Sequence, residues 1–356
     1  MKIGLIGAPG SGKTTIFNAL TRSNLDAGSY SSGKAEPHLA VVSVMDERIK
    51  HLTDMYHPKK TTYATVELVD FAGLAEGAAK NGVFSESTMG ILKNMDALVH
   101  VVRNFDNLIG EEPEPLRDID DIDTELLLSD LVITEKRLER IEWFRKRGQG
   151  SSELDAEERV LKKICGQLNE NGAVRDMALT REERKIIRGF QYLTGKPLMV
   201  ILNSEESRFG QQGRLISAMS ERYRVIECAG LFEMELSRFD SEEEAQLFME
   251  DMGIEESMRD RLTTCAYELV GYISFFTVGE DEVRAWTIVR GDTALEAAGA
   301  IHSDLARGFI RAECFTYDDL MQCRTEKSVR DNGKFRLEGK DYIVHDGDIL
   351  SIRFSV

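Results

Sequence analysis

The eight residues GAPGSGKT, from Gly7 to Thr14, constrain this chain more than any other stretch. They match the pattern GxxxxGK[ST] at every fixed position, and they lie between a strand-like run at 2–6 and a helical run. Glycines in such a loop let backbone N–H groups close around phosphates, and the start of the helix adds a positive dipole. We therefore predict a phosphate-binding loop in which Lys13 contacts the β- and γ-phosphates and Thr14 binds Mg²⁺. The same loop offers further nucleotide contacts at Gly7, Pro9, Gly10, Ser11, Gly12 and Thr15.

Short apolar runs recur between helical stretches, at 2–6, 39–44, 66–70, 97–102, 198–202 and 225–228. Several are continuous rather than alternating, which is typical of strands buried on both faces. Strands that alternate with helices predict an α/β fold with a mostly parallel sheet and helices on both faces. The gap between 102 and 198 is too long for one crossover, so the sequence predicts an inserted segment there.

The inserted segment has helical periodicity. An apolar stripe continues to Leu138 and Ile141, the glycine- and serine-rich stretch 144–152 interrupts it, and a second stripe follows through Leu161 and Ile164. These two helices predict an antiparallel, coiled-coil-like hairpin. Thr180 and Glu183 have the spacing of a capping box that opens another helix.

The hairpin has two interpretations, a structural arm with solvated charges or a contact arm. Residues 124–190 carry 14 Lys/Arg and 13 Asp/Glu, a net charge of +1, whereas the whole chain has a net charge of −17. In the contact-arm interpretation the partner-binding residues are those at the tip of the hairpin, Arg145, Lys146 and Arg147.

From about residue 275 the sequence changes to alternating segments with turn signals, which predicts a small mixed α/β domain. Residues 345–348, HDGD, are expected to form a turn between two strands. The predicted domains are therefore 1–122 and 195–274 for the sheet, 123–194 for the insertion and 275–356 for the last domain.

The five scattered cysteines form no CxxC pair, so we expect a reduced, cytoplasmic chain without a structural zinc site. No apolar stretch is long enough to span a membrane, and no secretory signal is expected.

Asp70 ends the third apolar run and begins the sequence Asp-Phe-Ala-Gly, which is a DxxG pattern. A carboxylate at this strand end is where a Walker B aspartate holds Mg²⁺ through water. Gly73, which closes the pattern, is expected to donate its N–H to the γ-phosphate.

The run VILNSEES, at 200–207, ends a later strand with Asn203 and two carboxylates. A guanine-binding site would need an Asp three residues after the Asn and a Lys between them, but here Glu206 stands three residues after it and the Lys is absent. The amide of Asn203 suits N7 and N6 of adenine. Whether Glu205 or Glu206 touches the base is left open by the sequence.

These motifs, and longer stretches from end to end, resemble the YchF family of Obg-like ATPases. The similar stretches are EPHLAVVSVMDERIKHL (36–52), VDFAGLAEGAAK (69–80), DALVHVVRNF (96–105), EVRAWTIVRGDTALEAAGAIHSDLARGFIRAE (282–313) and EGKDYIVHDGDILSIRFSV (338–356). The resemblance implies a GTPase-type core, a helical insertion and a C-terminal ubiquitin-like TGS domain. It also implies ATP hydrolysis with Mg²⁺, an NxxE base motif that prefers ATP to GTP, and association with ribosomes. The base-side positions that it implies are Asn203, Ser204, Glu206, Cys228, Ala229 and Gly230.

The chain also departs from the usual family pattern or from related GTPases. Gly10-Ser11 replaces an Asn-Val pair, and Lys34 replaces a threonine that closes over Mg²⁺ and the γ-phosphate. We hypothesise that Lys34 supplies positive charge to the transition state in place of the missing switch contact. Leu74 occupies the position where many GTPases have a water-orienting Gln, which the family also lacks, so turnover is expected to be slow. His100 is a candidate for a supporting catalytic role, although a core histidine with satisfied ring nitrogens is the simpler interpretation.

Three functional classes are compatible with these features. The first is an Mg²⁺-dependent NTPase that acts as a translation or stress factor on the ribosome. The second is a nucleotide-binding module with little turnover. The third is a nucleotide kinase, because GAPGSGK resembles the phosphate-binding loop of nucleoside monophosphate kinases.

Residues 276–356 carry 11 basic and 15 acidic residues, so contact with RNA is expected from a local patch rather than from overall charge. We expect a monomer without a membrane partner.

Overall fold

The computed structural model describes residues 1–23, 37–71, 84, 86–107, 109–239, 241–251 and 253–355. The chain divides into two compact units, the first formed by Met1–Val41 with Glu67–Arg259 and the second by Val42–Val66 with Asp260–Val356. The predicted domain boundaries remain predictions. The units differ from them in grouping residues 42–66 with the C-terminal part of the chain.

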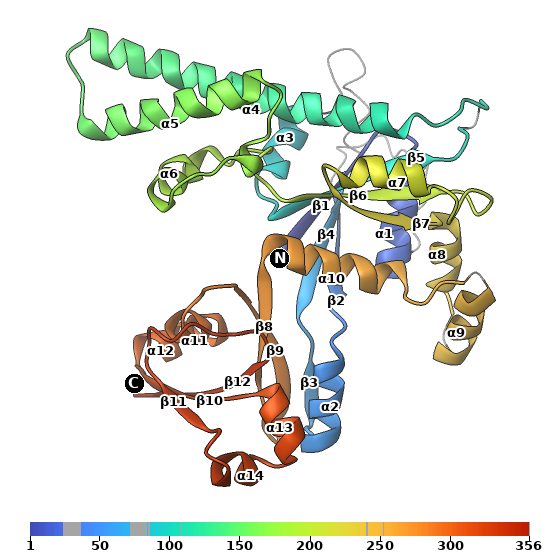
Figure 1. Cartoon of the computed structure of the whole chain (residues 1–356), viewed down its shortest axis with the longest axis vertical. Coiled ribbons are helices and arrows are strands. Elements are labelled where there is room, and N and C mark those ends of the chain that lie inside the picture. Colours follow the sequence, from blue (N-terminus) through green and yellow to red (C-terminus); the bar gives the residue numbers. More distant parts are fainter. Residues whose placement is uncertain are drawn as a thin grey trace. The chain divides into compact units, whose positions relative to one another are not determined.

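A six-stranded sheet forms the centre of the first unit, in the order β2-β4-β1-β5-β6-β7 (Figure 1). Its strands are β1 Lys2–Ile6, β2 His38–Ser43, β4 Thr65–Asp70, β5 Ala97–Asn104, β6 Leu198–Ser204 and β7 Arg224–Cys228. The pairs β1–β4, β1–β5, β5–β6 and β6–β7 are parallel. Each of the six predicted apolar runs is a strand of this sheet, and β6 is buried along its whole length, which explains its continuous apolar sequence.

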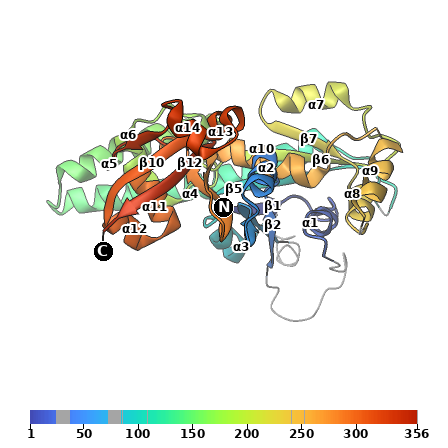
Figure 2. The same cartoon turned by 90° about the horizontal axis from the view of Figure 1, so that it is seen from below.

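Helices cover both faces of this sheet. Figure 2 shows α1, Lys13–Thr21, and α7, Gly213–Ser220, on opposite sides of the strands. On the α7 face, Met219 packs with Leu92 of α3, Glu86–Leu92, and with Ile122 of α4, Pro115–Lys146. The helix α8, Gly230–Leu236, follows β7. Its Phe232 packs near α9, which spans Glu242–Asp251. The parallel sheet with helices on both faces confirms the predicted fold class.

The inserted segment forms the predicted helical hairpin, with α4 spanning Pro115–Lys146 and α5 spanning Ser152–Asn169 (Figure 1). Gly148 turns the chain with a φ of 74°, and Ser151 caps α5 by accepting a hydrogen bond from the N–H of Leu154. Buried side chains of both helices form one apolar cluster, which includes Ile141 and Leu161. The predicted capping box is also confirmed, because Thr180 and Glu183 exchange hydrogen bonds at the start of α6, Arg181–Ile187.

The hairpin is fixed at its base by Asp130, a fully buried carboxylate on α4. It accepts hydrogen bonds from the N–H of Leu193 at 2.9 Å and from both the N–H and the hydroxyl of Thr194 at 2.7 Å. Because these residues precede β6 directly, Asp130 connects the inserted helix to the strand that returns to the sheet.

The second unit contains a mixed six-stranded sheet, in the order β11-β10-β12-β8-β9-β3. Its strands are β3 Lys60–Thr62, β8 Tyr272–Thr277, β9 Glu282–Val289, β10 Phe309–Thr316, β11 Arg336–Glu338 and β12 Asp348–Phe354. Its helices are α2 Glu47–Tyr56, α10 Met258–Val270, α11 Ala294–Ile301, α12 Ser303–Arg307, α13 Tyr317–Cys323 and α14 Glu326–Asp331. Ala294 and Ala297 of α11 pack on the sheet with Phe275 and Leu350.

Arg48 of α2 explains why residues 42–66 belong to this unit. Its guanidinium forms ion pairs at 2.8 Å with Asp46 and with Asp346, and it lies 5.0 Å from the ring centroid of Phe276. The β3–β9 pairing adds backbone hydrogen bonds to this connection. The grouping therefore depends on contacts between residues nearly 300 positions apart.

The turn predicted at 345–348 leads into β12, but the strand predicted before it is wrong. Ile343 forms only an isolated bridge with Thr293. Asp348 instead binds the preceding loop, since it accepts hydrogen bonds at 2.9 Å from the hydroxyl of Tyr342 and the N–H of His345. These hydrogen bonds hold the loop in place of a second strand. In the part of the chain that the structure describes, no helix is long and apolar enough to cross a membrane.

Candidate functional site

The loop between β1 and α1 has a shape that two glycines make possible. Gly12 has a φ of 88°, and a Cβ atom at this position would lie 2.2 Å from Nδ2 of Asn203. A Cβ atom at Gly7 would lie 2.4 Å from the carbonyl oxygen of Val101. Side chains at these positions would clash with neighbouring atoms, so the loop can approach β5 and β6 only as a glycine backbone.

Lys13 is held within this loop. Its ammonium group donates to the carbonyl oxygens of Gly7 at 2.9 Å and Ala8 at 2.8 Å, and the residue is only 7% exposed. Burial lowers the pKa of Lys13 to about 8, while the carboxylate of Asp70 acts in the opposite direction. A phosphate at this loop would compensate the buried charge, which is the role predicted for this lysine.

The side chains of Thr14, in α1, and Asp70, at the end of β4, lie next to each other. Two ligands of one magnesium ion must be close together in this way. The hydroxyl of Thr14 donates to Oδ2 of Asp70 at 3.1 Å, and Asp70 is fully buried at the end of β4. Nδ1 of His38 lies 3.8 Å from the same oxygen. A hydroxyl and a carboxylate are hard oxygen ligands of the kind that Mg²⁺ prefers, so these two residues fit the ion.

Asn203 connects the phosphate-binding loop to the loop after β7. Its Nδ2 donates to the carbonyl oxygen of Ser11 at 3.1 Å, and its Oδ1 accepts from the N–H of Gly230 at 3.1 Å. Both atoms of the amide therefore bind the protein, and the side chain clamps three segments of chain together. Contact with a purine stays a prediction, for which one amide hydrogen and one oxygen lone pair remain.

The acidic residues after Asn203 differ from each other. Glu205 forms an ion pair with Arg208 at 2.8 Å and accepts a hydrogen bond from Ser207, whereas Glu206 is exposed. The hydroxyl of Ser204 donates to Glu227 at 2.7 Å. Of the two glutamates, Glu206 is the one whose carboxylate forms no ion pair or hydrogen bond with the described part of the chain.

Glu227 and Asn104 were missed in the sequence. Glu227 of β7 receives hydrogen bonds from Ser204 and from the N–H of Gly210, and Asn104 donates to Ser204 at 2.8 Å. A charged residue inside the apolar run VIEC was the available signal for Glu227. His38, which lies near Asp70, was also missed, since a histidine beside a strand start has no distinctive pattern.

His100 is buried in β5, but the interpretation as a satisfied core histidine is wrong. Neither ring nitrogen has a hydrogen-bond partner among the residues that the structure describes. Burial and then the positive charge of Lys13 lower the pKa of His100 to about 3, so its ring is neutral at physiological pH. Lys34, Gly73 and Leu74 lie outside the described residues.

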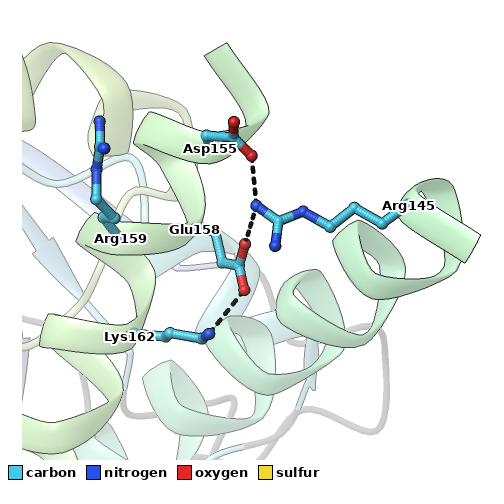
Figure 3. Close-up of a pocket in the computed structure, with 5 residues that line it drawn as sticks. All are labelled: Arg145, Asp155, Glu158, Arg159 and Lys162. Carbon is cyan, nitrogen blue, oxygen red and sulfur yellow. Dashed lines mark hydrogen bonds and ion pairs between the residues drawn. The ribbon is translucent and has the colours of Figure 1, made fainter. Parts of the chain in front are cut away.

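The three cations predicted at the hairpin tip have different environments. Arg145 forms ion pairs with Asp155 and Glu158 of α5, and Lys162 pairs with the second oxygen of Glu158 (Figure 3). Lys146 pairs with Glu142 at 2.8 Å, and Arg147 lies over the ring of Trp143. Arg145 and Lys146 therefore have carboxylate partners within the hairpin, and contact of all three cations with a partner stays a prediction.

The parallel sheet, the glycine loop with its buried lysine and the Thr14–Asp70 pair define a P-loop NTPase. Comparison with known families agrees with this class. Residues 2–136 match the family described as 50S ribosome-binding GTPase, and residues 272–355 match YchF-GTPase_C, described as a protein of unknown function (DUF933).

Full-length relatives make the assignment more specific. The chain is 38% identical over 363 residues to the ribosome-binding ATPase YchF of Haemophilus ducreyi, with 100% of this chain and 99% of the relative covered. The corresponding Bacillus subtilis protein is 35% identical, with 99% of each chain covered. The solved YchF GTPase of Schizosaccharomyces pombe is 32% identical, with a TM-score of 0.87 over 99% of this chain and 97% of that one. The chain belongs to the YchF family.

Proposed function

We propose that this chain binds ATP with Mg²⁺, hydrolyses its β–γ phosphoanhydride slowly and associates with ribosomes in the cytoplasm. The observation that carries the proposal is the arrangement around the loop of residues 7–14. A buried ammonium group, a hydroxyl–carboxylate pair and a glycine backbone come together there from two segments of the chain, the loop itself and the end of β4. Ribosome association is proposed because relatives that span the full chain are named ribosome-binding ATPases.

Each residue of the loop has a defined role in this mechanism. Lys13 binds the β- and γ-phosphate oxygens in exchange for its two carbonyl partners, which relieves the cost of its burial. Thr14 and Asp70 hold Mg²⁺, which when bound neutralises charge on the β- and γ-phosphates. The N–H of Gly73 is proposed to bind the γ-phosphate, and Lys34 to supply the charge that the missing switch threonine cannot.

His100 is proposed as a positioning residue rather than a proton carrier. A pKa of about 3 keeps its imidazole neutral, so it cannot act as an acid at physiological pH. Its ring nitrogens have no partner in the described chain, and the positive charge of Lys13 contributes to keeping the ring neutral, so the two side chains are electrostatically coupled.

The preference for ATP is supported by what the base side lacks. The sequence Asn-Ser-Glu-Glu has neither the lysine nor the aspartate of a guanine-binding motif. Glu206 is exposed, and its contact with the base stays a prediction. Titration with ATP and GTP tests this proposal. GTP binding tenfold tighter than ATP binding would refute it.

A binding module with little turnover is the second candidate, and Leu74 favours it because an apolar side chain cannot orient water. Phosphate release, measured with and without ribosomes, separates the two. Release that rises with ribosomes supports the hydrolysing factor, and no release in either condition supports the binding module. Lys34→Ala, measured in the same assay, tests the proposed charge. An unchanged kcat would exclude that role.

A further inference from the structure

The tip of the α4–α5 hairpin, defined as residues 140–151, carries an exposed aromatic side chain. Trp143 is 46% exposed, although tryptophan is normally among the more buried residues. The guanidinium carbon of Arg147 lies 3.7 Å from the centroid of its ring. Phe144 packs edge-on against Trp143 at 5.2 Å, and Arg140 lies 5.7 Å from the Phe144 ring. The tip therefore presents a flat aromatic ring with guanidinium groups around it.

The charge at the tip is positive, and only part of it is neutralised within the hairpin. Residues 140–151 contain four basic residues and one acidic residue, Glu142. Arg145 is bound by two carboxylates of α5, and Lys146 is bound by Glu142. Arg140 and Arg147 form no ion pair with the residues that the structure describes, and their cation–π contacts do not cancel their charge.

This combination fits RNA. The face of an indole ring stacks on an unpaired base, and stacking of this kind tolerates any base. Arginine binds phosphate through two parallel hydrogen bonds and also stacks on planar groups. A polyanion would be repelled by most of a chain whose net charge is −17, so a local positive tip is the kind of surface through which it could approach.

We propose that the hairpin tip is an RNA-contact surface, on which Trp143 stacks on an unpaired base while Arg140 and Arg147 contact phosphates. This inference deepens the proposed function, because it rests on ribosome association and names the part of the chain that meets ribosomal RNA. Arg145 has a different task. It holds the tip to α5, so that the ring of Trp143 is presented on a rigid support (Figure 3).

The first experiment uses the intrinsic fluorescence of Trp143. The chain has two tryptophans, so the full-length variant Trp286→Phe leaves Trp143 as the only one. An unstructured uridine-rich RNA oligonucleotide is titrated at low and high salt. We expect saturable quenching, with binding that weakens as salt rises because arginines release counterions from phosphates. Unchanged fluorescence at low salt overturns the proposal.

The second experiment measures ribosome affinity by co-sedimentation of full-length variants. Trp143→Ala and Arg147→Gln are each expected to weaken binding about tenfold, equivalent to about 1.4 kcal/mol. Trp143→Phe should recover part of the loss, because phenylalanine also stacks. Arg159→Gln is the matched control. It removes the same charge from an exposed position of α5 that lies outside residues 140–151, and it should leave affinity unchanged. The helical circular dichroism signal verifies that each variant is folded.

The outcomes separate the two proposals. Weaker ribosome binding without quenching by RNA overturns the RNA assignment in favour of a ribosomal protein as the partner. Full ribosome affinity in both tip variants overturns the tip as the contact surface while leaving ribosome association intact. Failure of the unmodified chain to co-sediment refutes the proposed association, and quenching by RNA then still supports the tip as an RNA-binding surface.

Discussion

Replacing Asn203 with alanine tests whether this residue is a clamp within the protein as well as a reader of the base. The change removes two hydrogen bonds of 3.1 Å, one to the carbonyl oxygen of Ser11 and one from the N–H of Gly230. Asn203 is only 4% exposed, so water cannot easily replace the amide. Leaving a buried backbone group unpaired costs about 1–3 kcal/mol, so two such groups predict a loss of about 2–6 kcal/mol in the stability of the first unit.

Two measurements check this prediction. The free energy of unfolding comes from urea titration, and hydrogen exchange reports locally on the segments 7–14 and 228–233. The binding of inorganic tripolyphosphate, which has no base, then distinguishes the two roles. A clamp residue supports the phosphate-binding loop, so Asn203→Ala should weaken tripolyphosphate as well as ATP. A residue that only reads the base would leave tripolyphosphate binding unchanged.

The matched control is Asn94→Ala, at an exposed position where the amide donates to Gly90 at 3.4 Å. It should change stability by less than about 0.5 kcal/mol. The clamp would be refuted if Asn203→Ala matched this control in stability and also kept its tripolyphosphate affinity.

Three further predictions follow from the same geometry. Lys13 is cationic below its pKa of about 8, so ATP affinity should fall up to tenfold per pH unit above pH 8. The affinity for adenosine, which has no phosphate, should not change with pH. An ATP affinity that is also independent of pH contradicts the role of Lys13. Gly12→Ala places a Cβ atom at a φ of 88° and against the side chain of Asn203, so it should destabilise the chain by more than about 2 kcal/mol. The control Gly210→Ala, with a φ of 74° and open space around the Cβ atom, should cost about 1 kcal/mol. Equal melting temperatures of the two variants would refute the clash at Gly12. Asp130→Ala leaves three hydrogen-bond donors without an acceptor, so it should destabilise the hairpin by about 3 kcal/mol in urea titration. A loss below about 1 kcal/mol means that other contacts hold the base of the hairpin.

The strands, helices and loop motifs of this protein could be predicted from the sequence because interactions between neighbouring residues specify them. Six apolar runs predicted the six strands of the first sheet, since strands buried on both faces need continuous apolar side chains. The P-loop pattern predicted Lys13 and Thr14 as site residues and the DxxG pattern predicted Asp70, and the fold brings the three side chains together. The stripes of the hairpin, and the capping box at Thr180, depend on helical spacing alone.

What the sequence did not predict has a common cause, which is that sequence patterns do not specify which groups surround a side chain in the folded protein. The sequence did not indicate that Arg145 forms ion pairs with Asp155 and Glu158 of α5. His100 was expected to be satisfied, but no pattern within its strand specifies what faces its ring. The strand expected before residue 345 is a loop, because Asp348 binds its backbone and side chains.

The sequence by itself determined the class of this protein, since the phosphate-binding loop and its helix are one continuous segment whose turn chemistry leaves few alternatives. It also determined that an insertion separates the last two strands from the others. Only the tertiary structure decided how Asn203 is used. Its partners, Ser11 and Gly230, are 192 and 27 residues away, and they meet its amide because parallel strands bring their carboxyl ends to one edge of the sheet.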